Sequence, residues 1–425
     1  NLGRPTRGAA LGLRARVLLY AASPLYNGNL DFFNVVDNKG NQLISQTYDE
    51  SKWAKAAAAA KDVIELAKTS GLYELYTIAP KIGTLDMYRP PVHPEYSTKD
   101  YPDGWANIDP LLSYKSNFDG SVQGSKNPEL IFTRTSDGTG TINDWMYQAL
   151  PRTISGNNRL CVTQKQVNAY AMNDGRTISE AANTGDYVAT GFTTEAYSEN
   201  NPFLPAKVSL MYNKREPRFY ASIAYNGSVW EAASASEPRY RNQQIFYYRG
   251  TEDGKQGFKE ECPLTGMTLK KFYNSEDSRT DGGYVIEKTE MTIRYAEILL
   301  IYAEALNELS EGEVYHLKTY SNEDVEIKRD EDEMRYAIKR IRMRAGVPDY
   351  TNETYKNQAD FRVKLKRERQ VELLGENSMR YFDLRRWKDA LTEENQLLQG
   401  CNINISDDDT YIADFYKETP VSSVH

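Results

Sequence analysis

Tryptophan and its polar neighbours are the residues of this chain best suited to binding a ligand. An indole flanked by amide and carboxylate groups can stack on the apolar face of a sugar ring while its neighbours bond the hydroxyls. Trp105 lies in YPDGWAN and Trp145 lies in NDWMYQ, both within a loop-rich region. The candidate ligand-binding residues are Trp105, Tyr101, Trp145, Tyr147, Asn143, Asp144, Trp230 and Phe32. Tryptophans in loops are also often buried and only hold the loop against the rest of the protein. Ligand binding and loop packing therefore both stay open for each of these tryptophans.

Three arginine-rich sequence segments, called phrases below, are the second group of residues whose side chains could bind a ligand or carry a reaction. They are RYAEILLIYAEALNE (294–308), IRMRAGVPDY (341–350) and RQVELLGENSMRYFDLRRW (369–387). The last phrase resembles a basic ligand clamp, but we expect Phe382, Leu384 and Trp387 to be buried. Charges beside buried apolar residues need partners. The phrases are therefore interpreted as scaffold, and Trp53 and Trp387 as core.

Glu368 and Glu372 stand one helical turn apart and are the most conspicuous candidate pair for acid–base catalysis. Arg367 and Arg369 flank them, so that salt bridges are the ordinary outcome. GxSxG, HExxH and GxxxxGK[ST] are absent from the sequence. We therefore predict no catalytic residue and no cofactor.

The three cysteines, Cys161, Cys262 and Cys401, lack the spacing of a zinc site. One disulfide is possible, but isolated buried thiols are favoured. DNKGN (37–41) and the acidic run at 407–409 do not fit the EF-hand pattern. No metal site is predicted.

Composition excludes several classes of function. The net charge of −8 and the pI of about 5.3 argue against nucleic acid as a partner. The apolar content of 40% supports a folded core. The longest apolar run, 298–303, is too short to span a membrane. The 31 tyrosines suit surfaces that bind polar ligands with apolar faces, although most of them are expected to wedge helices and loops together.

Helical patterns that must position these residues occur at both ends of the chain. Residues 6–23 carry two apolar faces, one with Leu13 and Val17 and one with Leu11 and Ala15, which predicts a helix sandwiched between neighbours. A second helix follows Asp49, a plausible N-cap, and ends at Gly71. Helices return from about 292 to 390, interrupted by a charged insertion near 320–332. Gly346 is expected just past a helix end.

The middle of the chain, from 78 to 281, is rich in Pro, Gly, Asn, Ser and Tyr. NPELIF (127–132) predicts a buried strand, and TQKQVNAYAMNDG (163–175) predicts a capped helix. REPRFYASIAYNG (215–227) alternates in a way that predicts a strand leading into a turn. Ordered regions of this length between helices usually carry function.

Taken in order, these phrases resemble the SusD/RagB family of nutrient-binding lipoproteins. The resemblance rests on GRPTRGAALGLRARVLLYAAS, YDESKWAKAAAAAKDVIE, NPELIF, TQKQVNAYAMNDGR, REPRFYASIAYNG, RYAEILLIYAEALNE, RMRAG and RYFDLRRW. It spans almost the whole chain. The family pattern begins well upstream of Gly3, with a lipidated cysteine and further helices. One flank of the first helix is therefore expected to lack its partner.

The resemblance implies a mostly α fold: a tetratricopeptide-like helical scaffold with a large loop-rich insertion and a few short strands. It implies one SusD-like domain, in which 1–77 and 282–391 form the scaffold, 78–281 the ligand face and 392–425 a surface tail. It also implies a lipid-anchored protein on the surface of a Gram-negative outer membrane. Its expected partner is a TonB-dependent SusC-like transporter.

The implied function is non-catalytic binding of a glycan and its delivery to that transporter. Some family members handle peptides instead. Two other classes of function stay open: a glycoside hydrolase, which needs two carboxylates about 5–10 Å apart, and a helical-repeat scaffold that binds only peptide or protein.

Overall fold

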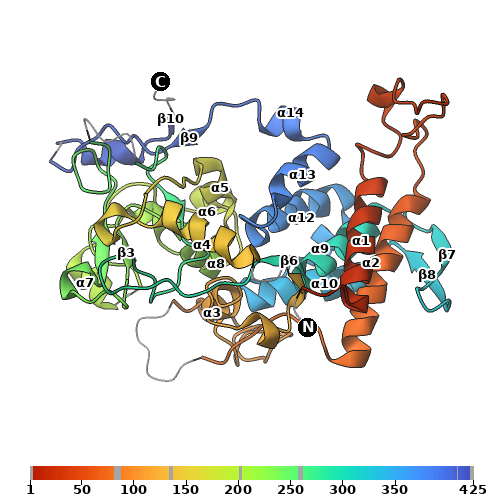
Figure 1. Cartoon of the computed structure of the whole chain (residues 1–425), viewed down its shortest axis with the longest axis horizontal. Helices are drawn as coiled ribbons and strands as arrows, with labels where there is room; N and C mark the ends of the chain where they lie inside the picture. The colour runs from red at the N-terminus through yellow and green to blue at the C-terminus, as the bar shows by residue number, and fades with distance from the viewer. Residues whose placement is uncertain are drawn as a thin grey trace.

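The computed structural model describes residues 3–80, 88–133, 137–200, 203–256, 262–408 and 410–421. Helices gather at one end of an elongated molecule, and shorter, irregular segments fill the other end (Figure 1). Each end has a large hydrophobic core of its own. The mostly α fold with a loop-rich middle and short strands is the fold that the sequence predicts.

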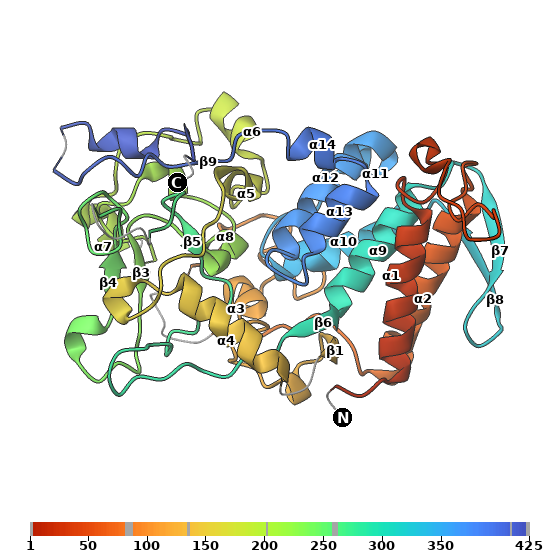
Figure 2. The ribbon, with the colours of Figure 1, turned by 45° about the horizontal axis from the view of Figure 1, so that its top comes forward.

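The helical end is built from segments at both ends of the chain. Its helices are α1 (Arg7–Ala22), α2 (Ser51–Ser70), α9 (Tyr295–Asn307), α10 (Glu331–Arg344), α11 (Asn352–Lys356), α12 (Gln358–Glu372), α13 (Met379–Arg386) and α14 (Ala390–Glu393). In Figure 2, α1, α2 and α9 run side by side. Alanines on α2 allow this close approach, and left-handed Gly71 (φ 64°) ends the helix as predicted. The N-cap is Glu50, one residue later than predicted.

Helix α1 buries only one of its two apolar faces. Leu11, Ala15 and Leu19 are buried in the core, whereas Leu13 and Val17 are more than half exposed. The prediction of a helix sandwiched on both faces is therefore wrong for this face, because no described segment covers it. The family resemblance led to a separate expectation, that one flank of this helix lacks a packing partner. The exposure of Leu13 and Val17 agrees with that expectation.

Helix α9 is buried along its entire length, carboxylates included. Arg16 donates to both Glu297 oxygens at 2.6–2.7 Å, and Arg386 donates to both Glu304 oxygens at 2.5–2.7 Å. Trp387 Nε1 donates to Glu304 Oε1 at 2.7 Å. Opposite charges thus satisfy the acids that the core encloses.

The last arginine-rich phrase serves as scaffold, as predicted. Arg369 and Arg386 bind Asp383 from two sides at 2.8 Å, all three being buried, and Leu384 and Trp387 pack beside them. Phe382 was expected to be buried as well, and this is wrong: its side chain is 44% exposed. As the residue before Asp383, it projects about 100° away from that carboxylate around the helix, and it contacts Tyr20 and Tyr381.

The middle of the chain folds around the second core with short elements. They are α3 (Pro110–Lys115), α4 (Asp137–Ala149), α5 (Gln164–Ala169), α6 (Ile178–Asn183), α7 (Glu195–Asn200), α8 (Pro217–Ser222), β2 (Ile223–Ala224), β3 (Ser228–Trp230), β4 (Gln243–Ile245) and β5 (Thr268–Leu269). Strand β2 pairs with β5, and β3 pairs with β4. Thr163 caps α5 as predicted.

The predicted strand at 215–227 is mostly a helix. Residues 217–222 form α8, and only Ile223–Ala224 is extended. Pro217 occupies the first helical position, where its fixed φ favours a helix start. Phe219 and Ala221 are buried, but so are Arg218 and Ser222, so that the apparent alternation marked no exposed face.

Strand β1 (Leu130–Thr133), which is the predicted NPELIF strand, joins the two ends of the molecule. It pairs antiparallel with β6 (Met291–Arg294), with Leu130 opposite Arg294 and Thr133 opposite Met291. Strand β6 leads directly into α9. The backbone around Met291 is therefore held between the loop-rich core and the helical core.

The charged insertion after α9 forms a hairpin that the sequence did not predict. Strands β7 (Val314–Lys318) and β8 (Asp324–Lys328) pair in register and lie against α2. Tyr315 and Leu317 of β7 and Val325 and Ile327 of β8 alternate with exposed residues and face the helical core, an alternation that was not used for the sequence-based prediction. Two further short strands, β9 (Gln399–Gly400) and β10 (Thr419–Pro420), pair in the tail.

The three cysteines are free thiols, as favoured from their spacing. Burial raises the pKa of Cys401 to about 12. Among the described residues, no helix is both long and apolar enough to cross a membrane. The described residues also contain no group of three or more His, Cys, Asp or Glu side chains arranged to hold a metal ion.

Candidate functional site

Trp145 is the one tryptophan of the chain with an accessible indole. Its side chain is 38% exposed, whereas the other four, Trp53, Trp105, Trp230 and Trp387, are at most 7% exposed. Trp53 and Trp387 are core residues, as predicted. Stacking on a sugar ring needs an open indole face, so this difference separates the candidates.

Trp105 and Trp230 serve the packing of the protein. Trp105 lies in a small cluster with Tyr96, Ile108 and Met343, and half-buried Tyr101 packs against it. Trp230 is completely buried, with its ring 4.6 Å from that of Tyr273. These two indoles therefore present no open face to a ligand in this structure.

The remaining candidates do not gather around one point. Phe32 is half-buried in a short 3-10 turn, Leu30–Phe32, in the loop after α1, and it does not line the cavity beside Trp145. Tyr147 is half-buried, and the Arg279 guanidinium lies 3.7 Å from the centre of its ring. Asp144 is exposed on α4, and the side chain of Asn143 lies outside the described part of the structure. The structure thus brings Trp145 together with residues that were not predicted.

Trp145 borders a cavity of about 170 Å³ between the two ends of the molecule. The residues lining it come from four segments besides α4: residues 289–291 at the start of β6, the loop at 375–378 between α12 and α13, and the two separate segments that carry Phe118 and Phe272. They are Phe118, Ile142, Trp145, Phe272, Thr289, Glu290, Met291, Gly375, Glu376, Asn377 and Ser378. We refer to this cavity as the Trp145 pocket.

One wall of the Trp145 pocket is aromatic. The Trp145 and Phe272 rings meet edge to face, with centroids 6.3 Å apart, and Phe272 contacts Phe118 in the same way at 6.1 Å. Phe118 and Phe272 are buried and fixed, whereas Trp145 lies at the rim. A fixed aromatic wall with one exposed indole is a ready surface for the apolar face of a ring-shaped ligand.

The loop from Gly375 to Ser378 adjoins Phe272 and forms another part of the lining, and its backbone is unusual. Gly375, Asn377 and Ser378 all have positive φ, of 71°, 44° and 56°. Left-handed conformations in residues other than glycine cost energy and cluster at functional sites. Asn377 Nδ2 donates to the Met291 carbonyl at 2.7 Å, which fixes the loop on β6.

The two carboxylates of the pocket differ in their surroundings. Glu376 accepts from Lys271 at 2.6 Å and from two nitrogens of Arg294 at 2.6 and 2.9 Å. Glu290, in contrast, has a buried Oε2 without a hydrogen-bond partner and forms no ion pair with a described residue. Glu290 is therefore the acid of the pocket that remains open to a ligand.

Glu368 and Glu372, the predicted pair of acids, belong to a buried ionic network next to this pocket. Arg218 bridges them, and Arg342, Arg294 and Arg344 bind their remaining oxygens. The arginines hold the pKa values of both carboxyls below their ordinary values despite burial. A carboxyl that stays ionised cannot serve as a general acid at neutral pH, so this pair acts as scaffold.

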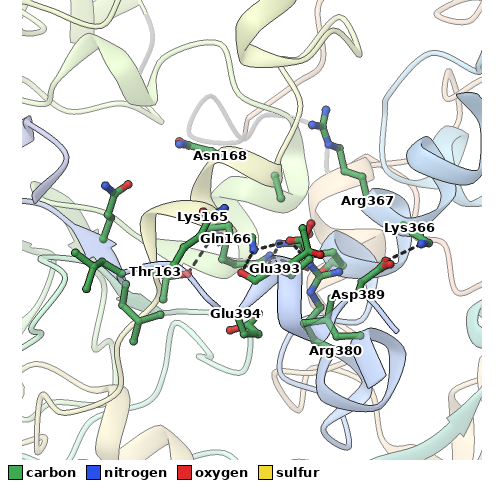
Figure 3. Close-up of a pocket in the computed structure, with 18 of the residues that line it drawn as sticks. Thr163, Lys165, Gln166, Asn168, Lys366, Arg367, Arg380, Asp389, Glu393 and Glu394 are labelled. Carbon is green, nitrogen blue, oxygen red and sulfur yellow. Dashed lines mark hydrogen bonds and ion pairs between the residues drawn. The ribbon is translucent and has the colours of Figure 1, made fainter. Parts of the chain in front are cut away.

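A second hollow, larger than the Trp145 pocket, is a polar groove of about 700 Å³ (Figure 3). It lies between α5, α12, α13, α14 and β9, and no aromatic ring lines it. Its charged residues largely pair with each other: Lys165 with Glu393 at 2.5 Å and Lys366 with Asp389 at 2.6 Å. Arg367, which is exposed, points away from these pairs (Figure 3).

The sequence contains little to reveal the Trp145 pocket. Phe118, Phe272 and Glu290 are isolated residues in three distant segments, and only the fold brings them together. The one local signal is Gly-Glu-Asn-Ser at 375–378, a turn-forming run between two helices. Such runs usually mark a turn and nothing more.

Comparison with known proteins agrees with this architecture. The sequence model of the SusD family matches residues 88–422, so the chain belongs to the SusD family. No curated protein matches the chain. Among solved structures, BT4246 superposes with a TM-score of 0.74 at 23% identity, covering 99% of this chain and 66% of its own length.

Two structures from Bacteroides fragilis are also similar. One is a SusD-like protein, with a TM-score of 0.57 at 22% identity over 94% of this chain and 57% of its own. The other is a SusD-like carbohydrate-binding protein, with a TM-score of 0.57 at 19% identity over 99% of this chain and 60% of its own. At these identities the likeness shows the fold alone, and the chain spans two thirds or less of the length of these three structures.

Proposed function

We propose that this protein binds a glycan at the cell surface, without catalysis, and places one sugar unit in the Trp145 pocket. The observation that carries the proposal is the exposed Trp145 indole on an otherwise buried aromatic wall, in one cavity with a fixed polar loop. Sugars bind in this way because their C–H faces stack on rings while their hydroxyls bond polar groups.

Membership of the SusD family supports the same proposal, since the family is one of nutrient-binding proteins. A relative of the same fold is described as carbohydrate-binding. We propose that a lipid anchor in the full-length protein holds it at the outer membrane and that a SusC-like transporter receives the ligand. The predicted ligand face, 78–281, then supplies Phe118, Trp145 and Phe272, while the C-terminal scaffold supplies the polar loop.

A panel of soluble oligosaccharides tests the proposal by isothermal titration calorimetry. We expect Trp145→Ala to weaken binding of any glycan that the wild type binds by roughly 10-fold or more, since aromatic stacking contributes about 1 kcal/mol or more beyond burial. The melting temperature should stay within about 2 °C, because an exposed side chain contributes little to stability. Normal binding by Trp145→Ala would show that the site lies elsewhere.

A further inference from the structure

The electrostatics of the Trp145 pocket point to a particular kind of sugar. Cations and anions next to the pocket are balanced: Arg218, Lys271, Arg294, Arg342 and Arg344 are bound by Glu129, Glu216, Glu368, Glu372 and Glu376. Each of these side chains is buried and already has its partner. Their combined charge is zero, so that they add no net charge next to the pocket.

Glu290 is not part of this set of paired charges. It lines the pocket directly before β6, and its backbone carbonyl accepts a hydrogen bond from Thr133 Oγ1. This hydrogen bond holds the backbone at the start of β6 and therefore fixes the position of the Glu290 Cα atom. Its Oε2 is enclosed and unpartnered, although a buried acceptor without a donor is costly. A ligand that brings a donor to this oxygen removes that cost.

The neighbours of Glu290 favour a positively charged donor. Trp145 and Phe272 present aromatic rings to the same cavity, and ring faces attract cations. The Phe118 ring already has a cation partner, since Lys271 Nζ lies 4.0 Å from its centre. Asn377 uses its amide N–H groups on the Met291 and Thr292 carbonyls, which leaves its oxygen as a further acceptor. Aromatic rings, a carboxylate and an amide oxygen together form a site for an ammonium group.

From this juxtaposition we infer that the Trp145 pocket recognises a sugar unit that carries a free, protonated amino group, with Glu290 as its specificity-determining residue. The inference rests on the proposed glycan-binding function and names its ligand class. In the bound state the ammonium donates to Glu290 Oε2 while the sugar ring covers the Trp145 indole. An N-acetylated sugar lacks the charge and places a methyl carbonyl group beside the carboxylate.

A pair of oligosaccharides that differ only in acetylation tests this inference. The probes are the chitosan hexamer, with free amines, and the chitin hexamer, with acetylated amines, titrated into the protein at pH 6 in low salt. A charge-assisted hydrogen bond to an enclosed carboxylate corresponds to a preference of roughly 10- to 100-fold for the chitosan hexamer. Equal binding of the two, a preference for chitin, or no binding of either would overturn the inference.

Three variants separate the inference from the proposed function. Glu290→Gln keeps the shape of the side chain and should abolish the preference between the probes, leaving weak binding to both. Glu287→Gln removes an exposed carboxylate three residues upstream and is the matched control, which should behave as the wild type. Trp145→Ala should weaken binding of both probes. A preference that persists in Glu290→Gln overturns the role of Glu290.

The proposed function fails in a different way. If a broad glycan panel shows binding, but not of the amino sugar, only the ligand class is wrong. If Trp145→Ala binds a panel glycan as tightly as the wild type, the site itself is wrong. Melting temperatures of all three variants should match the wild type within about 2 °C, since none of the three changes removes a core residue or an ion pair between described residues.

Discussion

At the scale of single residues, the tryptophans divide into packing residues and one binding residue, and the division is set by exposure. Trp105 is 6% exposed and contacts Tyr96 and Met343, whereas Trp145 is 38% exposed. Their local sequences are similarly rich in polar residues. The difference arises because Trp105 folds against α10, a segment more than 200 positions away in the sequence.

This division predicts that substitution by alanine destabilises the fold at Trp105 but hardly changes its stability at Trp145. Trp105→Ala should lower the free energy of unfolding by about 3–5 kcal/mol, because it opens a cavity in a closed cluster. Trp145→Ala should change it by less than about 1 kcal/mol. Urea unfolding followed by circular dichroism measures both. A strongly destabilised Trp145→Ala would mean that the indole is a packing residue after all.

Glu372 is the residue on which the buried ionic network depends most. It binds Arg218, Arg294 and Arg344 and is completely buried. Glu372→Gln keeps the volume but removes the charge, which leaves three guanidinium groups short of a partner. We expect a loss of about 3–5 kcal/mol in the free energy of unfolding, the usual effect of breaking a buried pair. An unchanged denaturation midpoint would contradict this account.

The same network predicts how stability depends on pH. The pKa values of Glu304, Glu368, Glu372 and Asp383 are lowered in the folded protein by their arginine partners. Their contribution to stability is therefore complete above the unfolded-state pKa values of about 4 and is lost as the pH falls below them. Urea unfolding should show a plateau near neutral pH and a steep loss from about pH 5 downward. Stability that is flat down to pH 3 would contradict this prediction.

At the scale of elements, the loop between α12 and α13 determines the shape of the Trp145 pocket. Gly375 has φ 71°, and a Cβ at this position would lie 3.3 Å from Phe272. Gly375→Ala should therefore cost about 1–2 kcal/mol in stability through backbone strain. It should also weaken glycan binding, because the loop and the aromatic wall must shift.

The control for this substitution is Gly312→Ala in the β7–β8 region, which also has a positive φ but has no neighbour near its Cβ. It should lose a similar amount of stability from strain while binding glycan normally. If both variants bind like the wild type, the loop does not shape the site.

Helix α1 offers a second prediction at this scale. The double variant Leu13→Ser, Val17→Ser changes the open face and should alter the free energy of unfolding of this chain by less than about 1 kcal/mol. Leu19→Ala changes the covered face, where the side chain is completely buried, and should cost about 2–5 kcal/mol. Thermal unfolding of the two variants compares the faces directly.

Elements with strong local signals could be predicted from the sequence. The alanine run of α2, the Thr163 cap of α5 and the turn at Gly346 (φ 66°) are local signals, and the structure contains all three. Helix α8 was missed because burial on all sides removes the periodic pattern that distinguishes a helix from a strand. The β7–β8 hairpin does alternate, but its two strands are short and lie in a charged segment that was interpreted as an insertion. Tertiary contacts decide such segments, and they are not visible in a short window of sequence.

At the scale of the whole molecule, the Trp145 pocket lies where the two cores meet. Strand β1 from the loop-rich end pairs with β6, which continues into the buried helix α9 of the scaffold. The pocket draws its rings from the loop-rich end and its polar loop from the segment between α12 and α13. The family's fold could be predicted from phrases that lie in the scaffold, but the site depends on contacts between distant segments and could not. Only Trp145 was recognised in advance.

The exposure of a single tryptophan provides the most direct test of the central claim, that a sugar unit covers the Trp145 indole. Acrylamide quenching of tryptophan fluorescence should reveal one accessible population, which Trp145→Phe removes, since the other four indoles are at most 7% exposed. A glycan shown by calorimetry to bind should protect this population from quenching. If the glycan binds and the quenching of Trp145 is unchanged, the sugar lies elsewhere on the protein and the account is contradicted.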